Sequence, residues 1–148
     1  MTQQTRTDVA LALLRAALGV VFVVHGAQKI FVFGLAGTTG FFESIGIPFP
    51  AVNAAIVMAV EFGGGLAILA GALTRLTGVL LAATMAVAMV TVHLPNGFLL
   101  PNGYEFTLTL FAMAVALVLT GAGRYSVDAA LNPVGNQEPV DVRLRRAA

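Results

Sequence analysis

The sequence contains no cysteine, and only 10% of its 148 residues are charged. Without cysteine the chain can form no disulfide, thiolate metal site, iron–sulfur ligand set or dithiol redox pair. An ordinary soluble domain carries about a quarter charged residues, so this chain has too little polar surface to face water all round. Its net charge of +1 also excludes the basic surface that nucleic-acid binding requires. If electrons pass through this protein, a bound group must carry them.

Hydrophobic residues make up 58% of the chain and form four long apolar stretches. A bilayer-spanning helix needs about 20 apolar residues, and four such spans with short loops nearly exhaust the length. We therefore predict an all-α integral membrane protein, an antiparallel bundle of four transmembrane helices in one domain, residues 1–131, followed by a polar, disordered tail, residues 132–148. The expected spans are residues 9–31, 51–73, 76–93 and 104–121.

Local signals refine this pattern. The first helix begins either near Val9 or just after Arg15. Six glycine and proline residues between positions 33 and 50 predict the longest internal loop, which lies at the membrane interface or folds back over the bundle. The repeated Leu-Pro-Asn-Gly at 94–97 and 100–103 predicts a loop of two turns. Ser126 is expected to cap a short amphipathic helix that ends at Leu131.

Basic residues predict the orientation of the bundle. Positively charged residues favour the cytoplasmic side of a membrane. An even number of spans puts the two termini and the turn at Arg75 on one side, and Lys29 on the other. The side with the two termini and the Arg75 turn carries six basic residues, namely Arg6, Arg75, Arg124, Arg143, Arg145 and Arg146. Both termini should therefore be cytoplasmic, in the cell membrane, and small residues, Gly63 to Gly65 among them, should allow tight helix packing.

Polar residues gather near the extracytoplasmic ends of the expected helices. Their positions predict one ligand-binding cluster, made by His25, Gln28, Lys29, Glu61, His93 and Glu105. The first three share one helix face, at i, i+3 and i+4. The alternatives are structural: Lys29 can reach the interface as an anchor, His93 can cap a helix, and Glu105 can complement a helix dipole. We predict no metal site, because the two histidines lack a matched second pair or any cysteine.

Glu61 is the most unusual of these residues, because it lies about ten residues into the second span, roughly 15 Å deep. An acidic side chain there costs about 2.5 to 3.5 kcal/mol unless it is paired or protonated. We predict that Arg15, from the first helix, forms a structural ion pair with Glu61. Glu61 could equally act as a proton carrier or a ligand contact.

Taken in order, these residues resemble the DoxX family of small bacterial and archaeal membrane proteins. The resemblance covers about residues 9–131. Its main elements are Leu14-Arg15, the segment from His25 to Lys29, the segment from Glu61 to Gly65 with Thr74-Arg75, His93, Glu105 and the segment from Gly121 to Asp128. It implies a four-helix membrane fold. For some relatives it also implies a membrane subunit of a thiosulfate:quinone oxidoreductase, or an anchor for a sulfurtransferase and a superoxide dismutase.

The leading functional hypothesis is a quinone-interacting membrane subunit of an oxidoreductase complex. His25, Lys29 or His93 would donate hydrogen bonds to a quinone oxygen, and Glu61 or Glu105 would carry protons. One alternative is a non-enzymatic anchor for soluble redox or sulfurtransferase partners, which would use Arg75, Arg124 and the tail. Another is a transporter of protons or small solutes, which would need to form a homo-oligomer. The sequence leaves open whether the protein is an enzyme.

Overall fold

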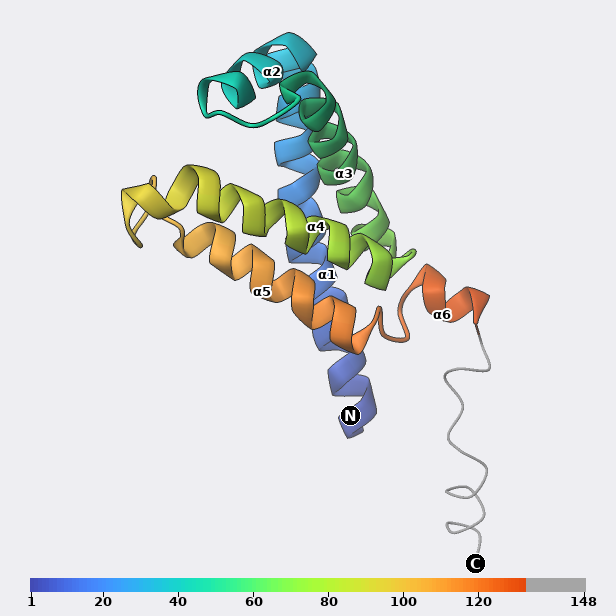
Figure 1. Ribbon diagram of the computed structural model, residues 1–148. Coiled ribbons are helices and arrows are strands. Elements are labelled where there is room, and N and C mark those ends of the chain that lie inside the picture. Colours follow the sequence, from blue (N-terminus) through green and yellow to red (C-terminus); the bar gives the residue numbers. More distant parts are fainter. Residues whose placement is uncertain (133–148) are drawn as a thin grey trace, which may run out of the picture.

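A computed structural model describes residues 1–132 as helices joined by short turns, with no strand in that range (Figure 1). The predicted all-α class is therefore confirmed for this part of the chain. A π-helical turn, η1 (Gln28–Phe33), continues α1, and another, η2 (Met89–His93), continues α4 into the short 3-10 turn η3 (Leu94–Asn96). The α-helices are α1 (Gln3–Ala27), α2 (Gly34–Ser44), α3 (Pro50–Ala70), α4 (Thr74–Ala88), α5 (Glu105–Thr120) and α6 (Val127–Leu131).

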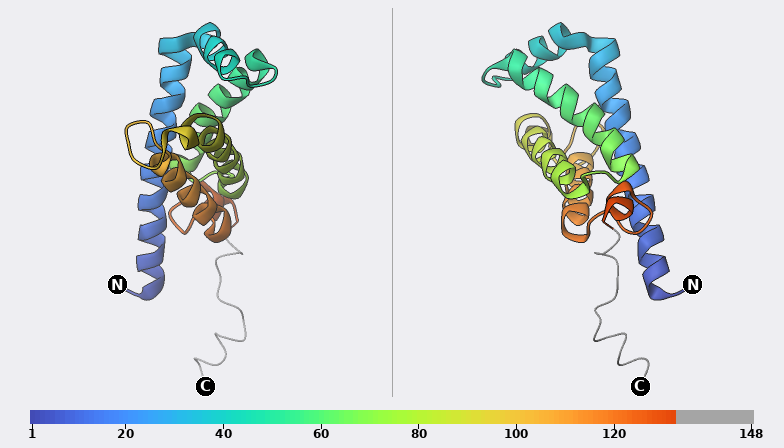
Figure 2. Two further views of the ribbon diagram at one scale, coloured as in Figure 1. Left: turned by 60° about the vertical axis from the view of Figure 1, so that its left-hand side comes forward. Right: turned by 90° about the vertical axis from the view of Figure 1, so that its right-hand side faces the viewer.

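The long helices form two packed pairs. Helix α1 lies along α3, and α4 lies along α5. The two pairs cross at a wide angle (Figures 1 and 2). Helix α2 covers the beginning of α3, at the end of the molecule opposite the N-terminus of the chain. The buried core lies where the pairs meet and consists of Leu18, Phe22, Ile68, Leu81, Ala82, Met85, Leu110, Ala114 and Leu117.

The outside of this assembly suits a lipid environment. Three continuous helical segments within residues 1–132 are long and apolar enough to cross a membrane, namely Gln3–Ser44, Pro50–Ala70 and Thr74–Asn96. Helix α5 is as apolar but has only 16 residues, about 24 Å at 1.5 Å per residue. Large apolar side chains are exposed along all four long helices, among them Leu13, Leu66, Val87 and Leu119. Exposed apolar surface on this scale is typical of a membrane protein.

Two sequence predictions for the first third of the chain are wrong. Helix α1 begins at Gln3, ahead of both predicted starts, because the Thr2 hydroxyl accepts a hydrogen bond of 3.2 Å from the Thr5 N–H and caps it. The predicted loop at 33–50 contains α2. The chain turns at Gly34, where φ is +65°, and then becomes helical despite its glycines. In an apolar setting every backbone polar group needs a partner, and a helix supplies them internally.

The second half of the chain follows the prediction more closely. The third long helical segment reaches His93 through η2, and α5 occupies most of the predicted fourth span. The Ser126 hydroxyl accepts a hydrogen bond of 3.1 Å from the Ala129 N–H, which confirms the predicted cap of α6. Of the predicted polar tail, residues 133–148 lie outside the described part of the chain.

Helices α1 and α3 approach closely through glycines. A Cβ atom added to Gly26 would lie 2.4 Å from the Phe62 nitrogen, and one added to Gly65 would lie 2.7 Å from the Val23 nitrogen. Gly65 is therefore one of the predicted small packing positions, whereas a Cβ at Gly63 would meet nothing within 4 Å. Because helices in lipid gain little from hydrophobic association, such close backbone contact is a main source of their packing energy.

A polar network joins the elements at one end of the molecule, which we call the base: Asp8, Gly71 to Thr74 and residues 121–131. The Asp128 carboxylate accepts hydrogen bonds of 2.7 and 2.9 Å from the Leu73 and Thr74 N–H groups and so caps α4. Asp8 accepts one of 3.0 Å from the Arg124 N–H. Both contacts fasten the segment that follows α5 to helices far away in the sequence.

Arg15 also belongs to the base. Its side chain is buried, and Nη2 donates a hydrogen bond to the Tyr125 carbonyl oxygen. Gly71 adjoins this guanidinium, and glycine is favoured there because its φ is +69° and an added Cβ would lie 2.5 Å from the Ser126 Cβ. Partial burial raises the pKa of Asp128, but the hydrogen bonds from Thr74 and Leu73 and the charge of Arg15 outweigh it and hold that pKa below its usual value.

The α1–α3 contact can be tested with a glycine pair. Gly26→Ala should force α1 and α3 apart and destabilise the protein by about 1 to 3 kcal/mol. Gly63→Ala, on the exposed face of the same helix α3, should leave stability unchanged or raise it by up to about 1 kcal/mol. Thermal unfolding of the purified protein in mild detergent measures both effects. Equal stability of the two variants would contradict the close approach.

The Asp128 cap predicts a pH dependence. A carboxyl whose pKa is lower in the folded state stabilises the fold above its unfolded pKa, about 3.9, and this contribution is lost as the pH falls through the folded pKa. Asp128→Asn keeps one acceptor oxygen and should cost about 1 kcal/mol at neutral pH. Its loss of melting temperature below about pH 4 should be smaller than that of the parent. The control Glu43→Gln, at an exposed carboxylate on α2, should behave as the parent; parallel curves for parent and Asp128→Asn would refute the assignment.

Candidate functional site

A cavity of about 1040 Å³ lies between the two helix pairs, at the end opposite the base. Side chains from α1, α2, α3, α4, α5 and the π-helical turns line it, and most are apolar. Sites for small molecules usually have volumes of about 300 to 1,000 Å³ with a few polar groups among apolar ones. This cavity is therefore large enough for a small molecule with an attached chain.

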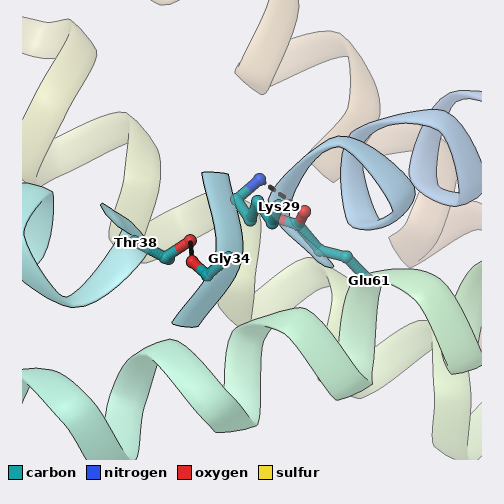
Figure 3. Close-up of polar contacts among 4 residues, drawn as sticks. All are labelled: Lys29, Gly34, Thr38 and Glu61. Atoms are coloured by element: carbon teal, nitrogen blue, oxygen red, sulfur yellow. Dashed lines mark hydrogen bonds and ion pairs between the residues drawn. The ribbon is translucent and has the colours of Figure 1, made fainter. Parts of the chain in front are cut away.

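An ion pair lies on the wall of the cavity. The Lys29 Nζ atom is 2.6 Å from the Glu61 Oε2 atom, and both residues line the cavity (Figure 3). The Glu61 side chain is 5% exposed and that of Lys29 22%, so the carboxylate is the more deeply placed partner. Pairing offsets the cost of placing each charge in an apolar medium.

The predicted ion pair between Arg15 and Glu61 is wrong. Glu61 pairs with Lys29, and the Arg15 guanidinium is engaged at the base with Tyr125. The reason is the direction of the helices. Arg15 lies far from the cavity end of α1, and an arginine side chain on a helix points back towards its N-terminus, which is towards the base.

The helix contact described above positions the pair. Gly26 packs against Phe62, the residue after Glu61, and Lys29 follows Gly26 by three residues, about one helical turn. Close approach at Gly26 therefore brings Lys29 within reach of Glu61. The signal for this pairing in the sequence is the glycine one turn before the lysine, because it marks the place where a second helix comes nearest.

The structure places both predicted histidines on the cavity wall. The His25 ring lies 6.3 Å from that of Phe106, between centroids, so His25 faces α5. The His93 Nδ1 atom is 2.9 Å from the Asn102 carbonyl oxygen, which orients its ring at the end of η2. Together with Lys29 and Glu61, four of the six predicted ligand-binding residues thus face one cavity. Ligand binding by these residues stays a prediction.

The other two predicted residues lie elsewhere. Gln28 is exposed and does not line the cavity. The Glu105 Oε1 atom accepts a hydrogen bond of 2.7 Å from the Leu100 N–H and so braces the connection between η3 and α5. In the described part of the chain, no group of three or more His, Asp or Glu residues is arranged to hold a metal ion.

Every threonine hydroxyl that lines the cavity already donates a local hydrogen bond, and Asn53 uses one of its two amide N–H groups in the same way. The Thr38 hydroxyl donates to the Gly34 carbonyl at 3.0 Å (Figure 3), and four others make similar local bonds, namely Thr84, Thr91, Thr107 and Asn53. The Lys29 ammonium has three N–H donors, and Glu61 accepts one of them. Lys29 is therefore the strongest donor that the cavity can offer to a ligand.

Both π-helical turns adjoin this site. Lys29 lies in η1 and His93 in η2, at matching ends of α1 and α4. Short π-helical turns inside α-helices are frequent at functional sites. The hydrophobic pattern could not reveal them, because a π turn changes the hydrogen bonding without changing residue type.

Comparison with known proteins agrees with this description. Residues 10–94 match the DoxX family. The chain is 36% identical to CatD of Bacillus subtilis (strain 168), whose name marks it as a candidate oxidoreductase, over 82% of this chain and 86% of CatD. It is 35% identical to the inner membrane protein YqjF of Escherichia coli (strain K12), over 84% and 94% of the two chains. It is 33% identical to the membrane protein Rv3486 of Mycobacterium tuberculosis, over 80% and 79%.

No solved structure matches the chain significantly. The family match covers the helices that carry Arg15, Lys29, Glu61 and His93, and the relatives extend it over most of the molecule. On this evidence, the chain is a membrane protein that belongs to the DoxX family.

Proposed function

We propose that this protein is a quinone-interacting subunit of an oxidoreductase complex in the cytoplasmic membrane. The observation that carries the proposal is the Lys29–Glu61 ion pair on the wall of a large apolar cavity between helices. Charged groups inside a membrane protein are costly and are usually kept for function. The name of CatD, a relative over most of the chain, supports an oxidoreductase role.

The residues present fit a quinone. Its ring is apolar and suits the cavity wall, and its carbonyl oxygens are hydrogen-bond acceptors, which Lys29 Nζ can serve with the N–H groups that Glu61 leaves free. A bound quinone would supply the two-electron, two-proton chemistry that the cysteine-free chain lacks. Lys29 would orient the ring, and Glu61 would hold or release a proton at Oε2. His25 and His93 line the same cavity and would supply further proton-exchanging groups.

The partners of such a subunit would be soluble redox or sulfurtransferase proteins. Since the cavity lies at the end opposite the base, we propose the base as the surface where they dock. We propose a topology to match, in which α5 crosses the bilayer together with the three longer segments. The base, with Arg75 and Arg124, would then face the cytoplasm, as the distribution of basic residues indicates.

The topology can be tested by single cysteines, because the chain has none of its own. Cysteine at Thr39 or Asn96, at the cavity end, should react with a membrane-impermeant thiol reagent added to intact cells. Cysteine at Arg75 should react only after the membrane is opened. External labelling of Arg75→Cys would reverse the orientation, and external labelling at Thr39 without labelling at Asn96 would mean that the two sites lie on opposite sides.

The quinone site can be tested by separating binding from stability. Lys29→Met leaves Glu61 buried without its partner, at a cost of about 3 to 5 kcal/mol while the carboxylate stays charged. Lys29→Met with Glu61→Leu removes both charges and should recover most of that stability. We expect both variants to bind a quinone analogue at least about tenfold more weakly, because a donor worth about 1.4 kcal/mol or more is lost.

Calorimetry on protein in mild detergent measures the affinity, and thermal unfolding measures the stability. Gln28→Leu, one residue away but outside the cavity, is the matched control and should bind as the parent does. Full affinity in the double variant would remove Lys29 and Glu61 from the site. No saturable binding by the parent would end the quinone proposal and favour the anchor or transporter alternatives.

A further inference from the structure

The cavity opens sideways, through a rim that is mostly apolar, with His25 and Thr91 as its exposed polar residues. Several of its lining side chains are also exposed at the surface, and they mark the opening. These are Phe41 of α2, Ile56 of α3, and Leu80 and Val87 of α4, which are 48%, 52%, 44% and 55% exposed. Glu61 and Lys29, by contrast, lie deeper in the same cavity. The charged side chains thus lie deep in the cavity, and mostly apolar side chains surround its opening.

The opening has the shape of a slot along α4. The lining residues Leu80, Ala83, Val87 and Thr91 follow one another at helical spacing of three or four, so they form one stripe, about 16 Å long at 1.5 Å per residue. The opposite edge is formed by α2 and the first half of α3. Ile56, on that edge, precedes Glu61 by five residues, which corresponds to about 7.5 Å along the helix.

Both edges belong to helices that are long and apolar enough to cross a membrane. If these segments cross the bilayer, the slot faces its hydrocarbon, because Ile56 and Leu80 are exposed and lie about six residues inside the segments Pro50–Ala70 and Thr74–Asn96. A portal for a water-soluble substrate would need polar side chains at its rim and a route to an aqueous face. The rim instead suits a molecule that is already dissolved in the membrane.

We propose that the ligand of this cavity enters laterally from the bilayer, and that the isoprenoid chain of a quinone occupies the slot between α2 and α4 while its ring lies at Lys29 and Glu61. This inference rests on the proposed function and adds the substrate class, a chain-bearing quinone, and its direction of entry. The volume of about 1040 Å³ supports it, because it exceeds what a ring alone requires.

Helix α2 offers a matched pair of positions for a test. Gly37 and Gly40 are both exposed glycines inside the helix, and Gly37 lines the cavity whereas Gly40 does not. A Cβ at Gly37 would lie 3.4 Å from the Phe33 Cβ, an ordinary contact, and one at Gly40 would meet nothing within 4 Å. Gly37→Leu should therefore narrow the slot without disturbing the fold. Gly40→Leu should leave both the slot and the fold unchanged. Ala83→Leu, on the opposite wall, gives a second variant that narrows the slot.

The absence of tryptophan allows a single fluorescent reporter. Phe41→Trp puts tryptophan on the slot, and Phe49→Trp puts it on an exposed position outside the cavity. Protein in lipid nanodiscs is titrated with a decyl-benzoquinone and with the same quinone lacking the decyl chain, both expressed per lipid. Quenching by the bound quinone reports binding and does not depend on turnover.

We expect saturable quenching of Phe41→Trp by the decyl quinone and only linear, non-saturating quenching of Phe49→Trp. Gly37→Leu or Ala83→Leu in the Phe41→Trp background should weaken binding of the decyl quinone by about fivefold or more. Either variant should change binding of the chain-free quinone by less than about twofold, and Gly40→Leu should change neither.

Equal effects of Gly37→Leu and Gly40→Leu on a parent that binds quinone would overturn the chain position and leave the proposed function standing. Equal affinity of the parent for the two quinones would do the same. Saturable quenching by a brominated phospholipid, without any by quinone, would overturn both the ring site and the quinone class. Absence of saturable quenching by every probe would overturn the lateral portal as well.

Discussion

The arrangement of the molecule depends on how closely α1 and α3 approach. Gly26 and Gly65 let the two backbones come together, and a single methyl group at either position would collide with the opposite backbone. In lipid this contact replaces the hydrophobic association that holds helices together in water. It also determines the register of the two helices, and with it the meeting of Lys29 and Glu61 one turn further along α1.

The two ends of the molecule have different roles because their polar groups are used differently. At the base, Asp8, Arg15 and Asp128 bind backbone groups of distant segments and join α1, the α3–α4 turn and the chain after α5. At the other end the helix pairs diverge, and the polar groups face a cavity instead of the backbone (Figure 2). A rigid junction at one end allows the other end to stay open without loss of the fold.

This division gives the family relationship a physical meaning. The match to the DoxX family covers residues 10–94, which hold the α1–α3 contact, the ion pair and the cavity side of α4. The last two helices complete the base and the far wall of the cavity. The residues that the family match covers thus include both the helix contact that holds the fold and the charged wall of the cavity.

Composition and hydropathy alone determined that the chain is an all-helical membrane protein, since so few charged residues cannot cover a soluble fold. The lengths of the apolar runs and the residues that interrupt them placed α3, α4 and α5 within a few residues of their positions, and Ser126 was recognised as a cap. Local patterns could not foresee α2, because its glycines read as breakers until the apolar environment required internal hydrogen bonds. They could not identify the partner of Glu61 either, because a salt bridge between helices depends on their register and closeness. The close approach at Gly26 brings Lys29 to Glu61, and Arg15 points to the base, where it bonds the Tyr125 carbonyl oxygen. The cavity exists because the two helix pairs cross at a wide angle.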